Sequence, residues 1–351
     1  MKNFSDYDPN GPSNPLNNIF GFPITEEEAD VVILPVPWEV TVSNTAGTAR
    51  AFEYVSKASL HVEVFDADYP EVWKRGFYMR PADKKILMKS DYLRKEAELY
   101  IDYISRGEDA DKNAFMCKSL KDINEGGIYL NNWVFEQTRE LMIKGKLVGL
   151  LGGDHSASMG YFKAVADQHG DFGILQIDAH CDLRKCYENF VYSHASIMYN
   201  ALHEIPQIQK LVQIGIRDLC QEEWDYIQAN NDRVVVFYDA HMKEKQFEGT
   251  LWREIADEII AQLPQKIFLS FDIDGLDPKQ CPNTGTPVSG GFDTEQVNYL
   301  LKRLIASGRQ LIGFDLMEIG VGENGWDANV GARQLFKLCN MLAHANSAPA
   351  S

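Results

Sequence analysis

Seven mainly apolar runs are spaced along the chain, and each is followed by a polar loop. The runs are VVILPV (31–36), LVGLL (147–151), FGILQI (172–177), LVQIGI (211–216), RVVVFY (233–238), KIFLSF (266–271) and QLIGFD (310–315). Such runs are typical of strands buried on both faces of a parallel sheet. Helices are predicted over 131–144, 157–168, 195–204, 221–229, 250–262, 293–306 and 328–343. Strands and helices in alternation predict a three-layer α/β/α sandwich around a central, mainly parallel β-sheet.

Two segments depart from this rhythm. Residues 1–28 are rich in Asn, Pro, Gly and Asp, which predicts an irregular N-terminal arm. Residues 60–125 are predicted to form an insertion with one helix, capped by Ser90 or Asp91 and ended by Gly107. Because the insertion lies inside one series of strands and helices, we expect a single domain over 1–351.

Polar clusters follow four of the predicted strands. The carboxyl ends of parallel strands meet at one edge of a sheet, so residues that follow different strands converge there. The clusters are GGDHS with Asp154 and His155, DAHCD with Asp178, His180 and Asp182, DIDGLDP with Asp272, Asp274 and Asp277, and DLMEIG with Asp315 and Glu318. This edge of the sheet is therefore the candidate site.

The spacing within two of these clusters favours metal binding. In an extended segment alternate side chains share a face, so Asp178, His180 and Asp182 point together, and Asp272 and Asp274 do the same. Neighbouring carboxylates repel each other unless a cation lies between them. Each motif alone also fits a turn or a helix cap. Their occurrence at successive strand ends favours a site for two divalent cations.

The ligand types narrow the choice of metal. The six candidate ligands are His155, Asp178, His180, Asp182, Asp272 and Asp274, and four of them are aspartates whose charges two divalent cations would balance. Mixed imidazole and carboxylate donors suit Mn²⁺, Fe²⁺, Co²⁺, Ni²⁺ or Zn²⁺ better than Mg²⁺ or Ca²⁺.

GGDHS, DAHCD and SFDIDGLDP together resemble the signature of the ureohydrolases, the arginase and agmatinase family, and the resemblance runs from about Asp30 to Cys339. It implies an arginase-like fold, two metal ions, Mn²⁺ in most members and Ni²⁺ in some, and hydrolysis of a guanidino C–N bond with release of urea. By this resemblance His155 and Asp182 hold one metal, His180 and Asp274 hold the other, and Asp178 and Asp272 bridge them.

The resemblance also assigns catalytic and substrate-binding roles. His194 corresponds to a family histidine expected to shuttle a proton to the leaving amine, and Glu318 to a glutamate that holds the guanidinium group. Asp182, His194 and Glu318 form the expected catalytic set. A helix-capping or surface role for His194, and an ion pair for Glu318, are the structural alternatives.

Two further residues are candidates for contact with the substrate. Thr48 lies in PWEVTVSNTAGTARA (37–51), and Trp326 in GENGWDANVGAR could offer an aromatic wall to a planar cation. Trp326 as a core aromatic that anchors the last helix is an equal alternative.

The substrate is expected to be a small cationic guanidino compound. LRKCYENFVYSHAS lacks the loop pattern with which arginases recognise an amino acid, whereas TGTPVSGG (284–291) resembles the agmatinase-like branch. Agmatine, cleaved to putrescine and urea, is therefore the leading substrate. Guanidine, cleaved to urea and ammonia, and another small guanidino acid are the alternatives. A metal-binding interaction protein without turnover is the alternative of a different class.

Composition limits the partners and the location. The net charge of −17, from 34 Lys and Arg against 51 Asp and Glu, argues against nucleic acid or an anionic membrane as partner. Six cysteines do not make a disulfide framework, and no apolar run reaches the ~18 residues of a membrane span. We expect a cytoplasmic protein, and the resemblance implies a homo-oligomer, either a trimer or a hexamer.

Overall fold

Eight parallel strands form one sheet at the centre of the protein, as the computed structural model shows for residues 4 and 7–347. The strands are β1 Val31–Val36, β2 Phe77–Met79, β3 Leu147–Gly152, β4 Phe172–Ile177, β5 Ile208–Ile216, β6 Val234–Tyr238, β7 Lys266–Asp272 and β8 Gln310–Met317. Their order across the sheet is β2-β1-β3-β8-β7-β4-β5-β6, and all neighbouring pairs are parallel. The predicted parallel sheet is confirmed, with β2 as an additional edge strand.

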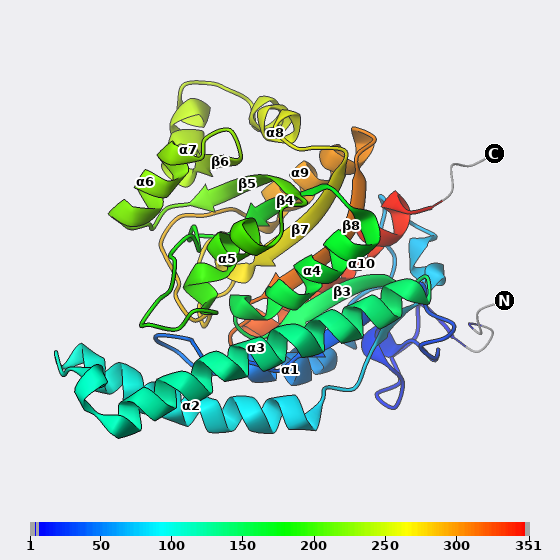
Figure 1. Ribbon diagram of the computed structural model, residues 1–351. Helices are drawn as coiled ribbons and strands as arrows, with labels where there is room; N and C mark the ends of the chain where they lie inside the picture. The colour runs from blue at the N-terminus through cyan, green and yellow to red at the C-terminus, as the bar shows by residue number, and fades with distance from the viewer. Residues whose placement is uncertain (1–3, 5–6, 348–351) are drawn as a thin grey trace.

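Ten α-helices accompany these strands in the described part of the chain. They are α1 Ala51–Ser59, α2 Lys84–Ser105, α3 Ala114–Ile143, α4 Met159–His169, α5 Ile197–Glu204, α6 Gln221–Ala229, α7 Asp239–Phe247, α8 Trp252–Ala261, α9 Thr294–Ala306 and α10 Trp326–Ala345. In Figure 1, α3, α4 and α5 lie in front of the sheet, and α9 and α10 lie behind it. The chain therefore has the predicted three layers, with apolar strands such as β1 and β4 buried along their whole length.

The segment 60–125 differs from its prediction. The helix α2 begins after Asp83, whose carboxylate accepts hydrogen bonds from Lys85 N and Ile86 N, and not at Ser90 or Asp91. Ser90 lies inside the helix, and its hydroxyl accepts a hydrogen bond from Glu39 N. The predicted end of the helix is close to the observed one. The helix α2 ends at Ser105, and Gly107 follows in a left-handed conformation with φ 77°.

A second helix also belongs to this segment. The predicted helix 131–144 is only the second half of α3, which starts after Asn113 and spans 30 residues. The helix α3 passes through the pair Gly126 and Gly127, although glycine has a low helix propensity. In Figure 1, α2 and α3 pack antiparallel at the bottom of the molecule and extend beyond the sheet as a hairpin.

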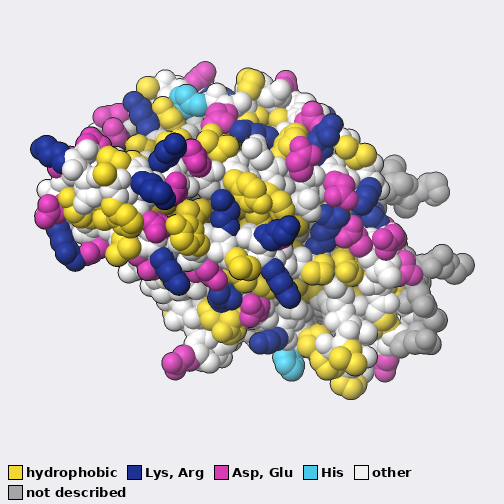
Figure 2. All heavy atoms as spheres, turned by 60° about the horizontal axis from the view of Figure 1, so that its bottom comes forward, with side chains coloured by type: hydrophobic (Ala, Val, Ile, Leu, Met, Phe, Trp, Pro, Cys, Tyr) yellow, Lys and Arg dark blue, Asp and Glu magenta, His cyan; other side chains and the backbone are white. Residues whose placement is uncertain are grey.

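The outer surface near this hairpin carries mixed charges. Figure 2, which brings the bottom of Figure 1 forward, shows Lys and Arg alternating with Asp and Glu among scattered hydrophobic side chains. Lys118–Asp122 and Lys121–Glu125 are ion pairs one turn apart on α3. Such exposed pairs contribute little to stability because solvent screens them.

The N-terminal arm is irregular, as expected, but it is not detached. Apart from a 3₁₀ turn at Ile19–Gly21, the described part of residues 1–28 has no regular element, and residues 1–3 and 5–6 of that prediction lie outside the described residues. Phe20 and Phe22 are fully buried, and Phe22 packs against Phe77 at the start of β2.

None of the helices in the described part of the chain has the length and apolar character that a membrane span requires.

Candidate metal centre and cavity

The six predicted ligands all follow strands at one edge of the sheet. His155 opens a 3₁₀ turn, His155–Ser158, directly after β3, and Asp154 caps this turn by accepting a hydrogen bond from Ser156 N at 3.1 Å. The loop after β4 carries Asp178, His180 and Asp182, while Asp272 ends β7 and Asp274 lies in the next 3₁₀ turn. The topology therefore brings together residues that are up to 119 positions apart in the sequence, from His155 to Asp274.

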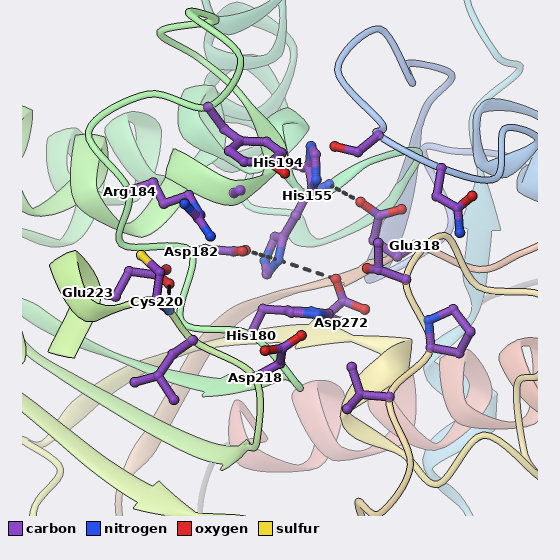
Figure 3. A pocket seen from close by; sticks show the side chains of 18 residues that line it. His155, His180, Asp182, Arg184, His194, Asp218, Cys220, Glu223, Asp272 and Glu318 are labelled. Carbon is purple, nitrogen blue, oxygen red and sulfur yellow. Dashed lines mark hydrogen bonds and ion pairs between the residues drawn. The ribbon is translucent and has the colours of Figure 1, made fainter. Parts of the chain in front are cut away.

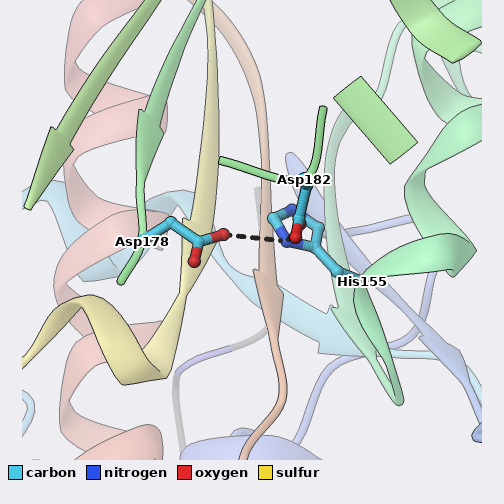
Figure 4. Close-up of side chains that lie close together, drawn as sticks. All are labelled: His155, Asp178 and Asp182. Carbon is cyan, nitrogen blue, oxygen red and sulfur yellow. Dashed lines mark ion pairs between the residues drawn. The ribbon is translucent and has the colours of Figure 1, made fainter. Parts of the chain in front are cut away.

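Three carboxylates converge on the His155 ring. Its Nδ1 atom lies 3.0 Å from Asp182 Oδ2, 3.2 Å from Asp178 Oδ2 and 3.5 Å from Asp272 Oδ2. Figure 4 shows the carboxylates of Asp178 and Asp182 on two sides of the ring. Asp182 reaches this position from a left-handed backbone conformation with φ 55°, an uncommon conformation for a residue other than glycine.

The second group of ligands shares Asp178 with the first. His180 Nδ1 lies 3.0 Å from Asp274 Oδ2 and 3.6 Å from Asp178 Oδ1. The two oxygens of Asp178 thus face different histidines, which is the arrangement that a bridging ligand requires. Asp178, His180 and Asp274 form one candidate metal-binding group, and His155, Asp178 and Asp182 form the other.

Burial and mutual repulsion act strongly on these groups. Burial, followed by the charge of Asp178, raises the pKa of Asp182 to about 7, and burial with Asp274 and Asp178 raises the pKa of Asp272 well above its usual value. Burial alone would raise the pKa of Asp178 as well, but His155 and His180 lower it. Carboxylates that repel each other in this way are stabilised by a cation.

The donor set fits two divalent metal ions. Among the described residues, the buried His155 Nδ1 makes no hydrogen bond of good geometry, although three carboxylate oxygens face it within 3.5 Å. Nitrogen and oxygen atoms aimed at one point without a hydrogen bond between them are what a cation in their midst requires. Two such groups that share Asp178 define a binuclear metal site.

Buried polar residues that the sequence analysis did not single out support the ligands. The far nitrogen of His155, Nε2, lies 2.8 Å from Ser270 Oγ, and Ser270 Oγ donates to the buried carboxylate of Asp315. Gln176 Nε2 donates to Asp178 Oδ2 at 2.8 Å, and Gln213 Nε2 donates to Gln176 Oε1. Their signal was a polar residue inside an apolar strand, since Ser270, Gln176 and Gln213 are fully buried in β7, β4 and β5.

A cavity of about 470 Å³ opens above the ligands. Figure 3 shows His155, His180, Asp182 and Asp272 at its floor, with Arg184, Cys220 and Glu223 along one side and Glu318 opposite. Its lining residues are Ser43, Asn44, His155, His180, Asp182, Arg184, Tyr187, His194, Ala195, Asp218, Leu219, Cys220, Glu223, Asp272, Thr286, Pro287, Val288 and Glu318. Five carboxylates against one guanidinium group in this lining favour a cationic ligand.

Glu318 presents a free carboxylate oxygen. Its Oε1 accepts a hydrogen bond from His155 N at 3.0 Å, whereas the buried Oε2 has no partner among the described residues. Burial, followed by the charges of Asp272 and Asp154, raises the pKa of Glu318 well above its usual value. A cation bound at Oε2 would therefore stabilise the ionised form of the Glu318 carboxylate.

His194 lies at the start of a 3₁₀ turn, His194–Ser196, and lines the cavity. Its Nδ1 is 3.3 Å from Ser193 Oγ and 3.4 Å from Thr41 Oγ1, and either hydroxyl can give or take a hydrogen bond. Burial, with the positive charges of His180 and His155, lowers the pKa of His194 to about 3. The ring is therefore neutral near neutral pH.

The other two candidates for substrate contact lie elsewhere. Thr48 is buried and is not among the lining residues, where Ser43 and Asn44 represent the same loop. Trp326 starts α10, is 44% exposed and donates from Nε1 to Lys279 O at 3.0 Å, also outside the lining. Asp277 closes a turn by accepting a hydrogen bond from Lys279 N, and Cys181 is buried.

Comparisons with known proteins identify the family of this chain. The model of the Arginase family matches residues 29–321. N(1)-aminopropylagmatine ureohydrolase of Thermus thermophilus is 30% identical over 311 residues, 88% of each chain, and the mitochondrial agmatinase of Gallus gallus is 29% identical over 213 residues, 59% of this chain and 60% of the relative. A hypothetical agmatinase from Burkholderia thailandensis superimposes with a TM-score of 0.70 at 20% identity, over 96% of each chain, and so shows the same fold.

The parallel sheet and the buried His and Asp groups define a protein with a candidate binuclear metal site at one edge of its sheet. The chain belongs to the arginase family. Within that family it is a ureohydrolase, a hydrolase that acts on linear amidines, and the alternative of a metal-binding protein without turnover is set aside.

Proposed function

We propose that this ureohydrolase cleaves agmatine to putrescine and urea. The observation that carries the proposal is the unpartnered Glu318 Oε2 beside the buried ligand cluster, in a cavity whose lining has five carboxylates against one guanidinium group. A planar guanidinium ion needs a carboxylate acceptor on one side and a nucleophile on the other. Glu318 and several residues of the ligand cluster line the same cavity.

The metal assignment follows the two ligand groups. His155 and Asp182 would hold one ion, His180 and Asp274 the other, and Asp178 and Asp272 would hold both, with Mn²⁺ as the proposed metal and Ni²⁺ as the alternative. When bound, two such ions supply an activated water as nucleophile and positive charge that offsets the charge developing at the guanidinium carbon.

Glu318 would orient the substrate. The His155 backbone N–H fixes Oε1, so Oε2 is presented to the cavity in a set direction. A guanidinium N–H that donates to Oε2 would hold the reacting carbon above the ligand cluster.

His194 would move the proton. His194 lines the cavity, and its unprotonated ring would take up the proton released by the attacking water. It would then pass this proton to the leaving nitrogen, so that the amine departs neutral. Ser193 and Thr41 hydroxyls steady the ring during both steps.

The tail of agmatine carries an ammonium group, and Asp218 is the proposed partner. Asp218 is exposed in the cavity lining, and its carboxylate has no hydrogen bond or ion pair with the residues that the structure describes. Glu223 lines the same side, but its oxygens already accept from Leu183 N and Cys220 N. Asp218 is therefore the carboxylate free for a cationic tail.

Arg184 supports a second candidate, a guanidino acid. Its guanidinium lies 4.8 Å from the centre of the Tyr187 ring and lines the cavity without an ion pair to the described residues. A carboxylate tail, as in guanidinobutyrate, would be attracted to this group. Free guanidine, which has no tail, would need neither Arg184 nor Asp218.

A urea-release assay separates these substrates. Protein loaded with Mn²⁺ or Ni²⁺ is given agmatine, guanidinobutyrate, guanidine and arginine, and kcat/KM is measured for each. We expect the highest kcat/KM with agmatine. A preference for guanidinobutyrate or guanidine would replace the substrate while keeping the enzyme class, and no urea from any of them would overturn the proposal.

Assembly and location remain predictions. A trimer or hexamer, and a cytoplasmic location, are expected from the resemblance and from the reduced cysteines. Light scattering of the purified protein would measure the assembly.

A further inference from the structure

We infer that the α2–α3 hairpin is a brace that positions the two loops on either side of the substrate cavity and so sets which substrates fit. The loops are residues 37–50, after β1, and residues 184–194, after the DAHCD motif. The inference rests on the proposed function only for the choice of substrates in its test.

The helix α2 holds the first loop from below. Arg94, which is 9% exposed, donates from Nη1 to Val42 O and, at 3.4 Å, to Val40 O. Ser90, one turn earlier on α2, accepts a hydrogen bond from Glu39 N at 3.0 Å. These contacts end directly before Ser43, the first residue of this loop in the cavity lining.

Glu39 carries the constraint across the loop. Its Oε2 accepts hydrogen bonds from Gly47 N at 2.6 Å and Ala49 N at 3.1 Å. The span between these anchors contains Ser43 and Asn44, which line the cavity. The position of this wall is therefore tied to α2 at its start and to Glu39 at its end.

Both helices hold the second loop. Asn124 of α3 accepts from Val191 N at 2.8 Å and donates to Asn189 O at 3.4 Å. Asn189 Nδ2 in turn donates to Tyr100 Oη of α2 at 2.9 Å, and the Tyr100 ring packs on the buried Phe190. This loop supplies Tyr187 and, three residues after Val191, His194.

The second loop needs such support because its backbone is strained. Glu188 and Asn189 both adopt left-handed conformations, with φ 53° and 65°, next to Tyr187 in the cavity lining. Residues other than glycine hold this conformation only where surrounding contacts enforce it. The Asn189 contacts to Tyr100 and Asn124 are contacts of this kind.

The glycine pair in the middle of α3 fits the same interpretation. A Cβ atom at Gly126 would lie 2.3 Å from Leu93 Cδ1 of α2, and one at Gly127 would lie 3.1 Å from Tyr192 Cβ of the second loop. Two glycines weaken a helix interior. Their place here lets α2 and the loop approach α3 closely.

The two loops also meet each other at the catalytic histidine. Thr41 Oγ1 in the first loop accepts a hydrogen bond from His194 N at 3.0 Å, and Asp154 Oδ2 accepts from Thr41 N at 3.2 Å. A shift of either loop would therefore move the wall and the His194 ring together. Arg94, Asn124 and Tyr100 are positioning residues, since none of them is in the cavity lining.

Two variants test the brace without touching the lining. Arg94→Met keeps most of the side-chain volume and removes the hydrogen bonds to Val40 O and Val42 O, and Asn124→Ala releases the second loop. Lys95→Ala and Lys121→Ala, exposed positions on the same two helices, are the matched controls, and Arg94→Lys tests rescue.

Each variant is measured for bound metal, for kcat and KM with agmatine and with guanidine, and for deuterium uptake of residues 37–50 and 184–194. We expect unchanged metal content, faster deuterium uptake in the released loop, KM for agmatine raised roughly tenfold and a smaller change of kcat. The ratio of kcat/KM for agmatine to that for guanidine should fall, because guanidine touches less of the walls.

Faster deuterium uptake in a loop, with an unchanged KM for agmatine and an unchanged ratio of kcat/KM for agmatine to that for guanidine, would overturn the inference. The loops would then move without effect on substrate choice. Uptake equal to that of the control variants would overturn it as well. Were the wild type to release no urea from any substrate, the proposed function would fail, whereas the uptake data would still decide whether the hairpin holds the loops.

Discussion

The Glu318 carboxylate accepts a hydrogen bond from the backbone N–H of His155 at 3.0 Å. This contact couples the residue proposed to hold the guanidinium group to the residue proposed to hold a metal, although they come from different strands. It leaves Glu318 Oε2 without a partner among the described residues and facing the cavity. The hydrogen bond between Glu318 and His155 would therefore set the position of the substrate relative to the metal ligands.

Replacement of Glu318 by Gln should damage turnover and spare the metals. The amide keeps the size of the side chain but loses the negative charge that attracts the substrate, so kcat/KM should fall by about 10²-fold or more. Metal content by elemental analysis should stay at the wild-type value. Glu323→Gln, at an exposed position shortly after, is the control, and a Glu318→Gln enzyme with the kcat/KM of this control would remove Glu318 from the substrate site.

Replacement of Asp178 by Ala should release both metal ions. The two oxygens of Asp178 face His155 and His180, so both candidate groups lose a ligand at once. Asp277→Ala, which removes a nearby acidic residue of the turn, should keep its metals. Full metal occupancy in the Asp178→Ala protein would contradict the bridging role.

Replacement of Ser270 by Ala should weaken metal binding without removing any ligand. Ser270 links His155 Nε2 to Asp315, and loss of such a link to a ligating histidine typically lowers metal affinity 10–100-fold. The buried Asp315 carboxylate also loses a donor, which should cost about 1–3 kcal/mol of stability. Competition with a chelator measures the affinity, and wild-type affinity would show that the Ser270 hydroxyl does not orient His155.

The stability of the metal-free protein should depend on His194 at acidic pH. Its pKa is lowered to about 3 in the folded state, against ~6.5 in an unfolded chain. As the pH falls from about 7 towards 3, the unfolded chain takes up a proton that the folded chain does not, so this part of the stability is lost. The melting temperature of His194→Asn should therefore fall less steeply below about pH 6.5 than that of the wild type. Parallel curves of melting temperature against pH would refute the lowered pKa.

The sheet and the ligand cluster could be predicted because their signals are local and repeated. Each apolar run is a strand in the structure, and the residues that follow β3, β4 and β7 meet because parallel strands end at one edge. The supporting residues Gln176 and Ser270 left only a weak signal, one polar letter in an apolar run. Their role depends on the facing strand, which no local pattern specifies.

The α2–α3 hairpin shows why the remainder was harder to predict. Ser90 is a good capping residue in sequence terms, yet in the structure it binds Glu39 N from inside the helix. Gly126 and Gly127 argue against a continuous helix, and α3 nevertheless passes through them, with Leu93 of α2 and Tyr192 of the second loop packed closely against them. Tertiary contacts overrode the local preference in both cases.

The most direct test of a binuclear metal hydrolase is a metal titration of the metal-free protein, with urea release from agmatine, guanidinobutyrate and guanidine measured at each step. We expect no urea without metal, and activity that rises until about two Mn²⁺ or Ni²⁺ ions are bound per chain. Full activity in the metal-free protein, or no urea from any of these substrates at full occupancy, would contradict the account.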